Sequence, residues 1–212
     1  EITIEDAIVN VDNSVATVSG SKVKFTINNI NATSTGYGII NKGSNNKYQL
    51  NEGTITSKDI TLYNESNNNN SYSVNGGTYT STTTYVFYDN TSYSSSFVMN
   101  GGKLVGATNG VYAYYGSFTV NDGEITTTST NNEHYALYCS TSAMCRLNSR
   151  AKIGSEQASG IYQYGGNTTI NGATIYTNKN NGNAIRLVNN NLTINGETTI
   201  SASGSNSYGI IA

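Results

Sequence analysis

The sequence predicts an all-β solenoid: a parallel β-helix of about eight rungs of roughly 24 residues, with three short strands in each rung. Three observations predict this fold. A motif ending in Asn recurs along the chain, three apolar clusters keep the same order in every repeat, and strand-forming residues alternate with polar ones inside the clusters. The helical spacing of apolar residues, three and four positions apart, is absent.

The recurring motif places two apolar residues before an Asn that is commonly followed by Gly, as in FTVNDGEI at 118–125. The motif Asn residues are Asn28, Asn51, Asn75, Asn100, Asn121, Asn148, Asn171 and Asn195. Successive ones lie 21 to 27 residues apart. Self-similarity at this period is typical of solenoids, in which each turn contacts only its neighbours.

Each repeat supplies three strands. In one repeat the first strand contains Phe118 and Val120, and the second contains Ile125. The third strand begins with a small residue followed by an aliphatic one, as in Gly160-Ile161. Because side chains alternate between the two faces of a strand, the apolar members should point into the coil. The sequence therefore predicts one interior column of stacked aromatic residues, namely Phe25, Tyr48, Tyr72, Phe97 and Phe118.

The repeated Asn marks the corner between the first and second strands. Asn tolerates the left-handed backbone conformation better than other residues with a side chain, so several of these Asn residues are predicted to adopt it. Stacked amides can also hydrogen-bond along a solenoid as an asparagine ladder. A β-branched residue in place of Asn121 should therefore be strained. The alternative, separate hairpins with Asn-Gly turns, would not require the third cluster to recur in register.

The 212 residues form one predicted domain, with residues 1–24 as an irregular first rung or cap. In this segment Ile2, Ile4 and Ile8 fit the second and third strands of a preceding rung. The sequence shows no amphipathic capping helix, although the open β-edges of a solenoid need caps. We therefore expect residues 1–212 to be a fragment of a longer surface protein.

Charge and hydropathy narrow the expected partners. Only 11% of the residues are charged and the net charge is -2, so nucleic acid is not an expected partner. No run approaches the roughly 18 apolar residues of a membrane span, so insertion of this segment into a membrane is not expected either. No cofactor is predicted, and the composition leaves the oligomeric state open.

The two cysteines, Cys139 and Cys145, both occupy positions assigned to the interior. They flank one corner between a third strand and the next first strand. Two interpretations remain, which are buried free thiols and a disulfide that closes the corner. So few cysteines suit a protein exported to a place where free thiols are avoided.

The Asn-cornered repeat of three strands resembles the right-handed parallel β-helix proteins of the pectin-lyase-like class, which include bacterial and archaeal surface adhesins. The resemblance covers residues 25–212. It implies a right-handed coil. It does not imply one activity, because the class contains lyases, hydrolases, tailspikes and adhesins alike.

The set of residues that enzymes of this class use is absent from the sequence. Asn-Thr-Asp, Asp-Asp and Gly-His-Gly segments do not occur. Acid–base hydrolysis of a glycoside needs two carboxylates converging on one bond, whereas Glu124 has Lys103 and Lys152 in the rungs on either side, which predicts surface ion pairs. His134, the single histidine, is expected in a solvated loop without metal partners. The chain is therefore predicted to be non-enzymatic.

The third strands carry the candidate binding residues. If Val86, Val111, Leu137 and Ile161 point inward, the next residue in each strand points outward on four consecutive rungs. These outward residues are Phe87, Tyr112, Tyr138 and Tyr162, with Tyr114 and Tyr164 in a second column. An aromatic strip suits a polysaccharide or a protein surface. Alternatively, the rings stack on one another to stiffen the coil, or pack beneath a loop.

These features favour a non-catalytic, adhesin-like β-helix module that is secreted or displayed at the cell surface. Its expected ligands are a glycan or a host surface protein. The alternative is a fragment of a polysaccharide lyase or glycoside hydrolase with the same fold. A pair of carboxylates converging in a groove would favour the enzyme, and a smooth cylinder with an aromatic strip would favour the adhesin.

Overall fold

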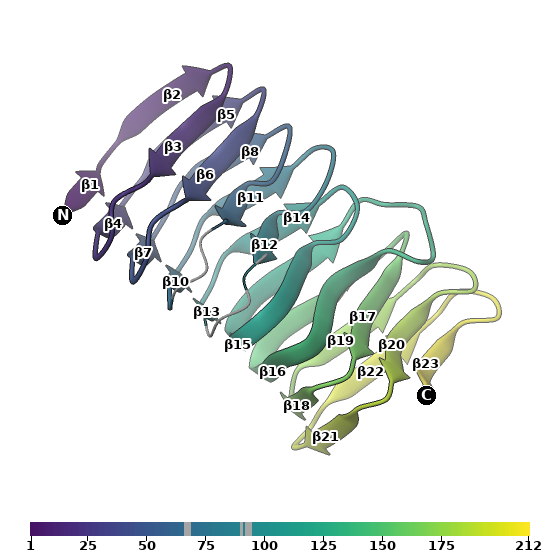
Figure 1. The fold of residues 1–212 in the computed structure, drawn as a ribbon. Coiled ribbons are helices and arrows are strands. Elements are labelled where there is room, and N and C mark those ends of the chain that lie inside the picture. Colours follow the sequence, from purple (N-terminus) through teal and green to yellow (C-terminus); the bar gives the residue numbers. More distant parts are fainter. Residues whose placement is uncertain (66–68, 90, 92–94) are drawn as a thin grey trace.

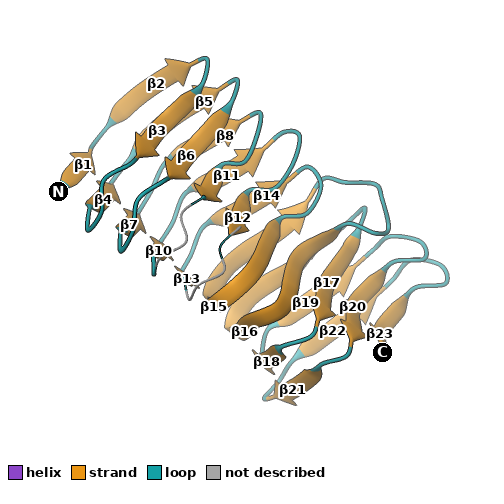
Figure 2. Cartoon of the chain, viewed as in Figure 1, coloured by secondary structure: helices purple, strands orange, loops and turns teal. Residues whose placement is uncertain are grey.

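The chain forms a parallel β-solenoid of about eight turns of about 24 residues (Figure 1). The computed structural model describes residues 1–65, 69–89, 91 and 95–212. In these ranges every regular element is a strand, and loops join the strands (Figure 2). The predicted fold class is confirmed. No helix among the described residues is long and apolar enough to cross a membrane.

The strands form three columns in which each strand pairs in parallel with its counterparts one rung away. The first column contains β1 (Ile2–Ile4), β4 (Lys24–Ile27), β7 (Lys47–Leu50), β10 (Ser71–Val74), β13 (Ser96–Met99), β18 (Asn167–Asn171) and β21 (Asn191–Asn195). The second contains β2 (Ala7–Val11), β5 (Ile30–Ser34), β8 (Thr54–Ser57), β11 (Thr78–Ser81), β14 (Lys103–Gly106), β19 (Thr174–Thr177) and β22 (Thr199–Ala202).

The third column contains β3 (Ser14–Val18), β6 (Tyr37–Asn41), β9 (Leu62–Asn64), β12 (Phe87–Asp89), β17 (Ser159–Tyr164), β20 (Asn183–Val188) and β23 (Tyr208–Ile211). Two long strands, β15 (Val111–Thr127) and β16 (Tyr135–Ser155), each run through all three columns. Their pairing shifts register at the corners, between Ala113 and Tyr115 and between Val120 and Asp122.

The predicted aromatic column lies inside the coil and is confirmed. Its five members are at most 3% exposed. Tyr48 and Tyr72 stack with their ring centroids 4.6 Å apart, and Phe97 stacks on Phe118 at 4.7 Å. Between these two pairs the ring of Phe87 enters from the third column, 5.4 Å from Tyr72 and 4.5 Å from Phe97. The result is a continuous aromatic core.

The asparagine ladder is also present. Each Asn from Asn51 onward donates its amide hydrogen to the side-chain oxygen of the motif Asn one rung earlier, over distances of 2.7 to 3.0 Å. Asn28, at the start of the ladder, donates to Glu5 at 2.7 Å. The ladder therefore keeps this corner in register from one rung to the next.

The left-handed conformation at this corner belongs to a different residue from the one predicted. None of the ladder Asn residues has a positive φ. The positive φ falls on glycines further along the corner, such as Gly77 at 81° and Gly102 at 86°. A Cβ on Gly102 would also come within 2.6 Å of the Gly77 carbonyl oxygen. The corner thus divides its two requirements, because the amide ladder needs Asn and the reversed backbone needs Gly.

The prediction that residues 1–24 form an irregular first rung or cap is corrected by the structure. These residues form a regular rung. Ile2–Ile4 pairs in register with Phe25–Ile27 of the first column, and Ala7–Val11 pairs with Ile30–Ser34 of the second. Ile2 and Ile4 therefore belong to a first strand. Ile8 was expected in a strand. It lies in β2, and it is 79% exposed.

Substitution of Asn121 tests the ladder. Asn121→Ala and Asn121→Val each remove the bonds to Asn100 and Asn148 and should lower the free energy of unfolding by about 1–2 kcal/mol. Because Asn121 lies within an extended strand and has no positive φ, Val should be no worse than Ala. Urea denaturation measures both variants, with Thr193→Ala on the exposed face as the control. A much larger loss for Val would restore the strained-corner explanation.

Candidate functional site

A strip of five tyrosines lies on the outer side of the third column. Tyr63, Tyr88, Tyr112, Tyr138 and Tyr162 occupy the same place in five consecutive rungs. We call these five residues the tyrosine strip. All five are half-buried, and they continue at the next rung into Arg186. The strip brings together three of the predicted site residues, Tyr112, Tyr138 and Tyr162.

Phe87 was predicted to be in this strip and is not. It pairs in register with Leu62 and Val111, is 2% exposed, and packs into the aromatic core. The outward place in its rung belongs to Tyr88. The error was a one-residue slip, since Val86 occupies the position that a small residue such as Gly110 fills in the next rung. A slip of one residue exchanges the two faces of a strand.

The rings of the strip stack along the solenoid axis. Tyr112 and Tyr138 are almost parallel, with centroids 4.4 Å apart and 11° between their planes. Tyr162 follows Tyr138 at 4.8 Å, and Tyr88 precedes Tyr112 at 5.3 Å. The planes of these two neighbouring pairs are tilted, by 41° between Tyr138 and Tyr162 and by 55° between Tyr88 and Tyr112, so each inner ring contacts a ring on both sides but only one pair is a parallel stack. These contacts agree with the alternative interpretation, in which the rings pack on one another and stiffen the coil.

Two further predicted residues flank the strip and are more open. Tyr114 is 40% exposed and lies 6.1 Å from Tyr112 with nearly parallel planes. Tyr164 is 44% exposed and has the same relation to Tyr162, at 6.5 Å. Aromatic rings exposed to this extent are suited to packing against a ligand.

Burial raises the pKa of three phenols of the strip. Burial, reinforced by neighbouring hydroxyls, raises the pKa of Tyr88 and Tyr112, and it raises the pKa of Tyr138 as well. At one end Arg186 lies 5.6 Å from the ring of Tyr162 and is paired with Glu133 at 3.0 Å. The surface is therefore a row of tyrosine side chains that ends at Arg186, whose charge is balanced by Glu133.

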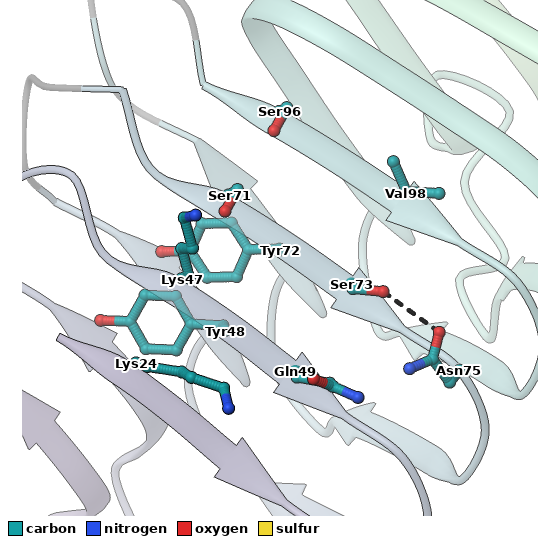
Figure 3. A pocket seen from close by; sticks show the side chains of 10 residues that line it. All are labelled: Lys24, Lys47, Tyr48, Gln49, Ser71, Tyr72, Ser73, Asn75, Ser96 and Val98. Atoms are coloured by element: carbon teal, nitrogen blue, oxygen red, sulfur yellow. Dashed lines mark hydrogen bonds between the residues drawn. The ribbon is translucent and has the colours of Figure 1, made fainter. Parts of the chain in front are cut away.

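A hollow on a different face was missed by the sequence analysis. It lies on the outer side of the first column, has a volume of about 470 Å³, and extends over β4, β7, β10 and β13. Figure 3 shows Lys24 and Lys47 at one end, with Gln49, Ser71 and Ser73 further along. The only signal in the sequence was the repetition of polar residues at the same place in successive rungs, which solvent exposure alone explains.

The charged residues singled out from the sequence form surface ion pairs, as predicted. Glu124 contacts Lys103 at 3.1 Å and Lys152 at 3.7 Å. An Arg-x-Lys triplet of the kind found in polygalacturonase-like hydrolases does occur, at Arg150–Lys152. However, Arg150 is paired with Asp122 at 3.0 Å. These carboxylates are engaged by cations and face no shared groove in the described structure.

Neither His134 nor the cysteines form a metal site in the described part of the chain, where no cluster of metal-ligating side chains is present. His134 Nδ1 is 2.6 Å from the hydroxyl of Ser129 in its loop. Cys139 and Cys145 are joined in a disulfide that closes the corner between the third and first columns. Both are buried, in agreement with their assigned interior positions.

One buried carboxyl is unlike the others. Asp89 is 3% exposed, and it accepts a hydrogen bond of 2.9 Å from the amide of Asn64. Burial raises the pKa of Asp89 to about 6, although hydrogen bonds from Thr91 and Asn64 act in the opposite direction. It stands above Asn41 and Asn64 in a buried polar column. This position serves the interior and is not open to a ligand.

No known protein family, curated protein or solved structure matches this chain. The parallel β-solenoid is therefore established by the structure alone.

The strip should contribute unequally to stability. Tyr138 contacts a neighbouring ring on each side, so Tyr138→Ala should lower the free energy of unfolding by about 1–3 kcal/mol. Tyr164 contacts the strip on one side only, and Tyr164→Ala should cost less than about 1 kcal/mol. Urea denaturation of the two variants, monitored by circular dichroism, checks the difference. Equal losses would show that stacking does not stabilise the coil.

Asp89 should make stability depend on pH. Its folded pKa of about 6 lies above the usual value of 3.8, so its unfavourable effect develops as pH rises from about 4 to 6 and is complete above 6. Asp89→Asn should raise the free energy of unfolding at pH 7.5 by about 1–3 kcal/mol and flatten that pH dependence. Asp12→Asn removes the same charge at an exposed corner and should not. An unchanged pH profile in Asp89→Asn would contradict this assignment.

Proposed function

We propose that this chain is a non-catalytic, adhesin-like binding module that holds a polysaccharide along its tyrosine strip. The observation that carries the proposal is the uninterrupted run of half-buried tyrosines over five rungs, flanked by the more exposed Tyr114 and Tyr164. Tyrosines at the same place in successive rungs form a row along the axis, which suits an extended chain with repeated hydroxyls. Stacking on Tyr114 and Tyr164 would supply the apolar part of the contact.

A position outside the cell, either secreted or attached to the surface, accords with the disulfide. Disulfides persist in oxidising compartments and are rare where cytosolic reductants act. Cys139 and Cys145 form a disulfide, and both are buried. The solenoid architecture and the asparagine ladder support the resemblance to pectin-lyase-like surface adhesins in form.

The enzyme alternative, a lyase or hydrolase fragment, has less support. Glu124 and Asp122 are the carboxylates closest to a catalytic pattern, and both are paired with cations. Asp89 has a raised pKa, as a general acid would, but it is buried in the interior. A host surface protein remains the other candidate ligand for the strip, and the same binding experiment distinguishes it.

A glycan-array screen of the intact chain tests the proposal, followed by calorimetry with the glycan it identifies. The double variant Tyr114→Ala/Tyr164→Ala should weaken binding by about tenfold or more, because truncating an aromatic anchor commonly costs more than about 1 kcal/mol. It should leave the far-ultraviolet spectrum and the unfolding midpoint close to those of the unaltered chain.

Tyr208→Ala is the matched control, because Tyr208 is 56% exposed and lies outside the strip. It should bind as tightly as the unaltered chain. Equal losses in the control and the double variant would reject the strip as the binding surface. Absence of any bound glycan, together with binding of a protein partner that the double variant abolishes, would assign the strip to protein recognition.

A further inference from the structure

The outer face of the first column carries a long groove formed by two adjoining hollows. The 470 Å³ hollow of Figure 3 ends at Ser96 and Val98. A second hollow of about 260 Å³ begins at Ser117 and Thr119. Ser96 pairs with Ser117 and Val98 pairs with Thr119 on neighbouring rungs, so the two hollows adjoin. Together they extend from β4 to β18, six rung spacings or about 29 Å.

The charges of this groove have one sign. Its cations are Lys24, Lys47 and Arg146, and no Asp or Glu is among the described residues that line it. Lys24 is neutralised by Glu1 at 2.7 Å. Lys47 and Arg146 are both exposed, and neither has an ion pair within the described ranges. On a chain of net charge -2, this face is therefore locally positive.

The stacking of Lys24 directly beside Lys47 is unfavourable without an anion. The two residues pair in register on neighbouring rungs, so like charges stand opposite each other. Elsewhere the chain alternates signs in such a column, as in Lys103, Glu124 and Lys152. Glu1 pairs with Lys24 and not with Lys47, so a bound anionic group near Lys47 would relieve the remaining repulsion.

Between the cations the groove offers hydroxyl and amide groups. Gln49, Ser71 and Ser73 line the first hollow, and Thr169 and Asn167 line the second. These groups can hydrogen-bond both to sugar hydroxyls and to anions. The apolar lining residues are Val98, Met144 and Cys145, together with the buried rings of Tyr48 and Tyr72.

The form of the groove favours a glycan over an acidic peptide. An extended peptide gains most of its affinity by pairing its backbone with a free sheet edge. Here the face of the sheet, and not an edge, is turned to solvent. β10 already pairs with β7 and β13 on its two edges. A peptide would therefore have only side-chain contacts.

We propose that this groove binds an extended anionic glycan, with its acidic substituents at Lys47 and Arg146 and its hydroxyls along the Ser, Thr and Gln side chains between them. The site is separate from the tyrosine strip, which lies on the third column. Uronate carboxylates and sulfate esters share the required chemistry of an anionic oxygen cluster on a sugar.

The test is calorimetric titration of the intact chain with three oligosaccharides of equal length: an oligouronate, a sulfated oligosaccharide and a neutral one. At least one anionic oligomer should bind, the neutral one should bind at least about tenfold more weakly, and affinity should fall as salt is added. The anionic oligomer that binds more tightly identifies the acidic group. An acidic peptide of similar length should bind more weakly than either.

Lys47→Gln and Arg146→Gln should each weaken binding of the anionic oligomer by about tenfold, which corresponds to the loss of one charge-assisted hydrogen bond. Lys58→Gln is the matched control, since it removes the same charge from an exposed corner on another side. The Tyr114→Ala/Tyr164→Ala variant should bind the oligomer normally, which separates this site from the strip. Equal effects of Lys58→Gln and Lys47→Gln, no binding of either anionic oligomer, or tighter binding of the peptide would overturn the proposal.

Discussion

Each side chain of this solenoid must fit beside the residue at the same place in the next rung, about 4.8 Å away. The whole structure depends on this constraint, because parallel rungs in register repeat every contact along the axis. Only certain side chains are compatible with a near copy of themselves at that distance. Aromatic rings stack, as Tyr48 does on Tyr72, and amides donate and accept in turn, as in the ladder through Asn75 and Asn100.

The same constraint explains which side chains occupy the outward-facing columns. Tyrosines stack outside the coil as they do inside, so the strip is at once a stiffening element and a surface. Charges satisfy the constraint by alternating in sign, as Glu124 does between Lys103 and Lys152. Lys24 beside Lys47 departs from that rule, and a local departure from a rule obeyed elsewhere commonly marks a functional surface.

The corner between the third and first columns is closed by different chemistry in different rungs. Tyr48 donates to Asn41 at 2.7 Å in an early rung, and a disulfide joins Cys139 to Cys145 in a later one. In the next rung Thr168 donates to Gln163. What is preserved is a link across the corner, and it need not be the same link because each one is completed within or near its own rung. This freedom contrasts with the asparagine corner, where every member bonds to the next.

The sequence by itself determined the period, the order of the three strands and the aromatic core, because regular spacing and alternation of apolar residues depend only on local geometry. It also determined that Asn would form a ladder. Only the tertiary structure decided that Phe87 faces inward and Tyr88 outward, since alternation fixes relative faces but needs an anchor to fix the absolute one. The structure likewise placed the left-handed turn on Gly77 and Gly102 and revealed the groove around Lys47, because a turn conformation and a hollow arise from how several rungs pack together.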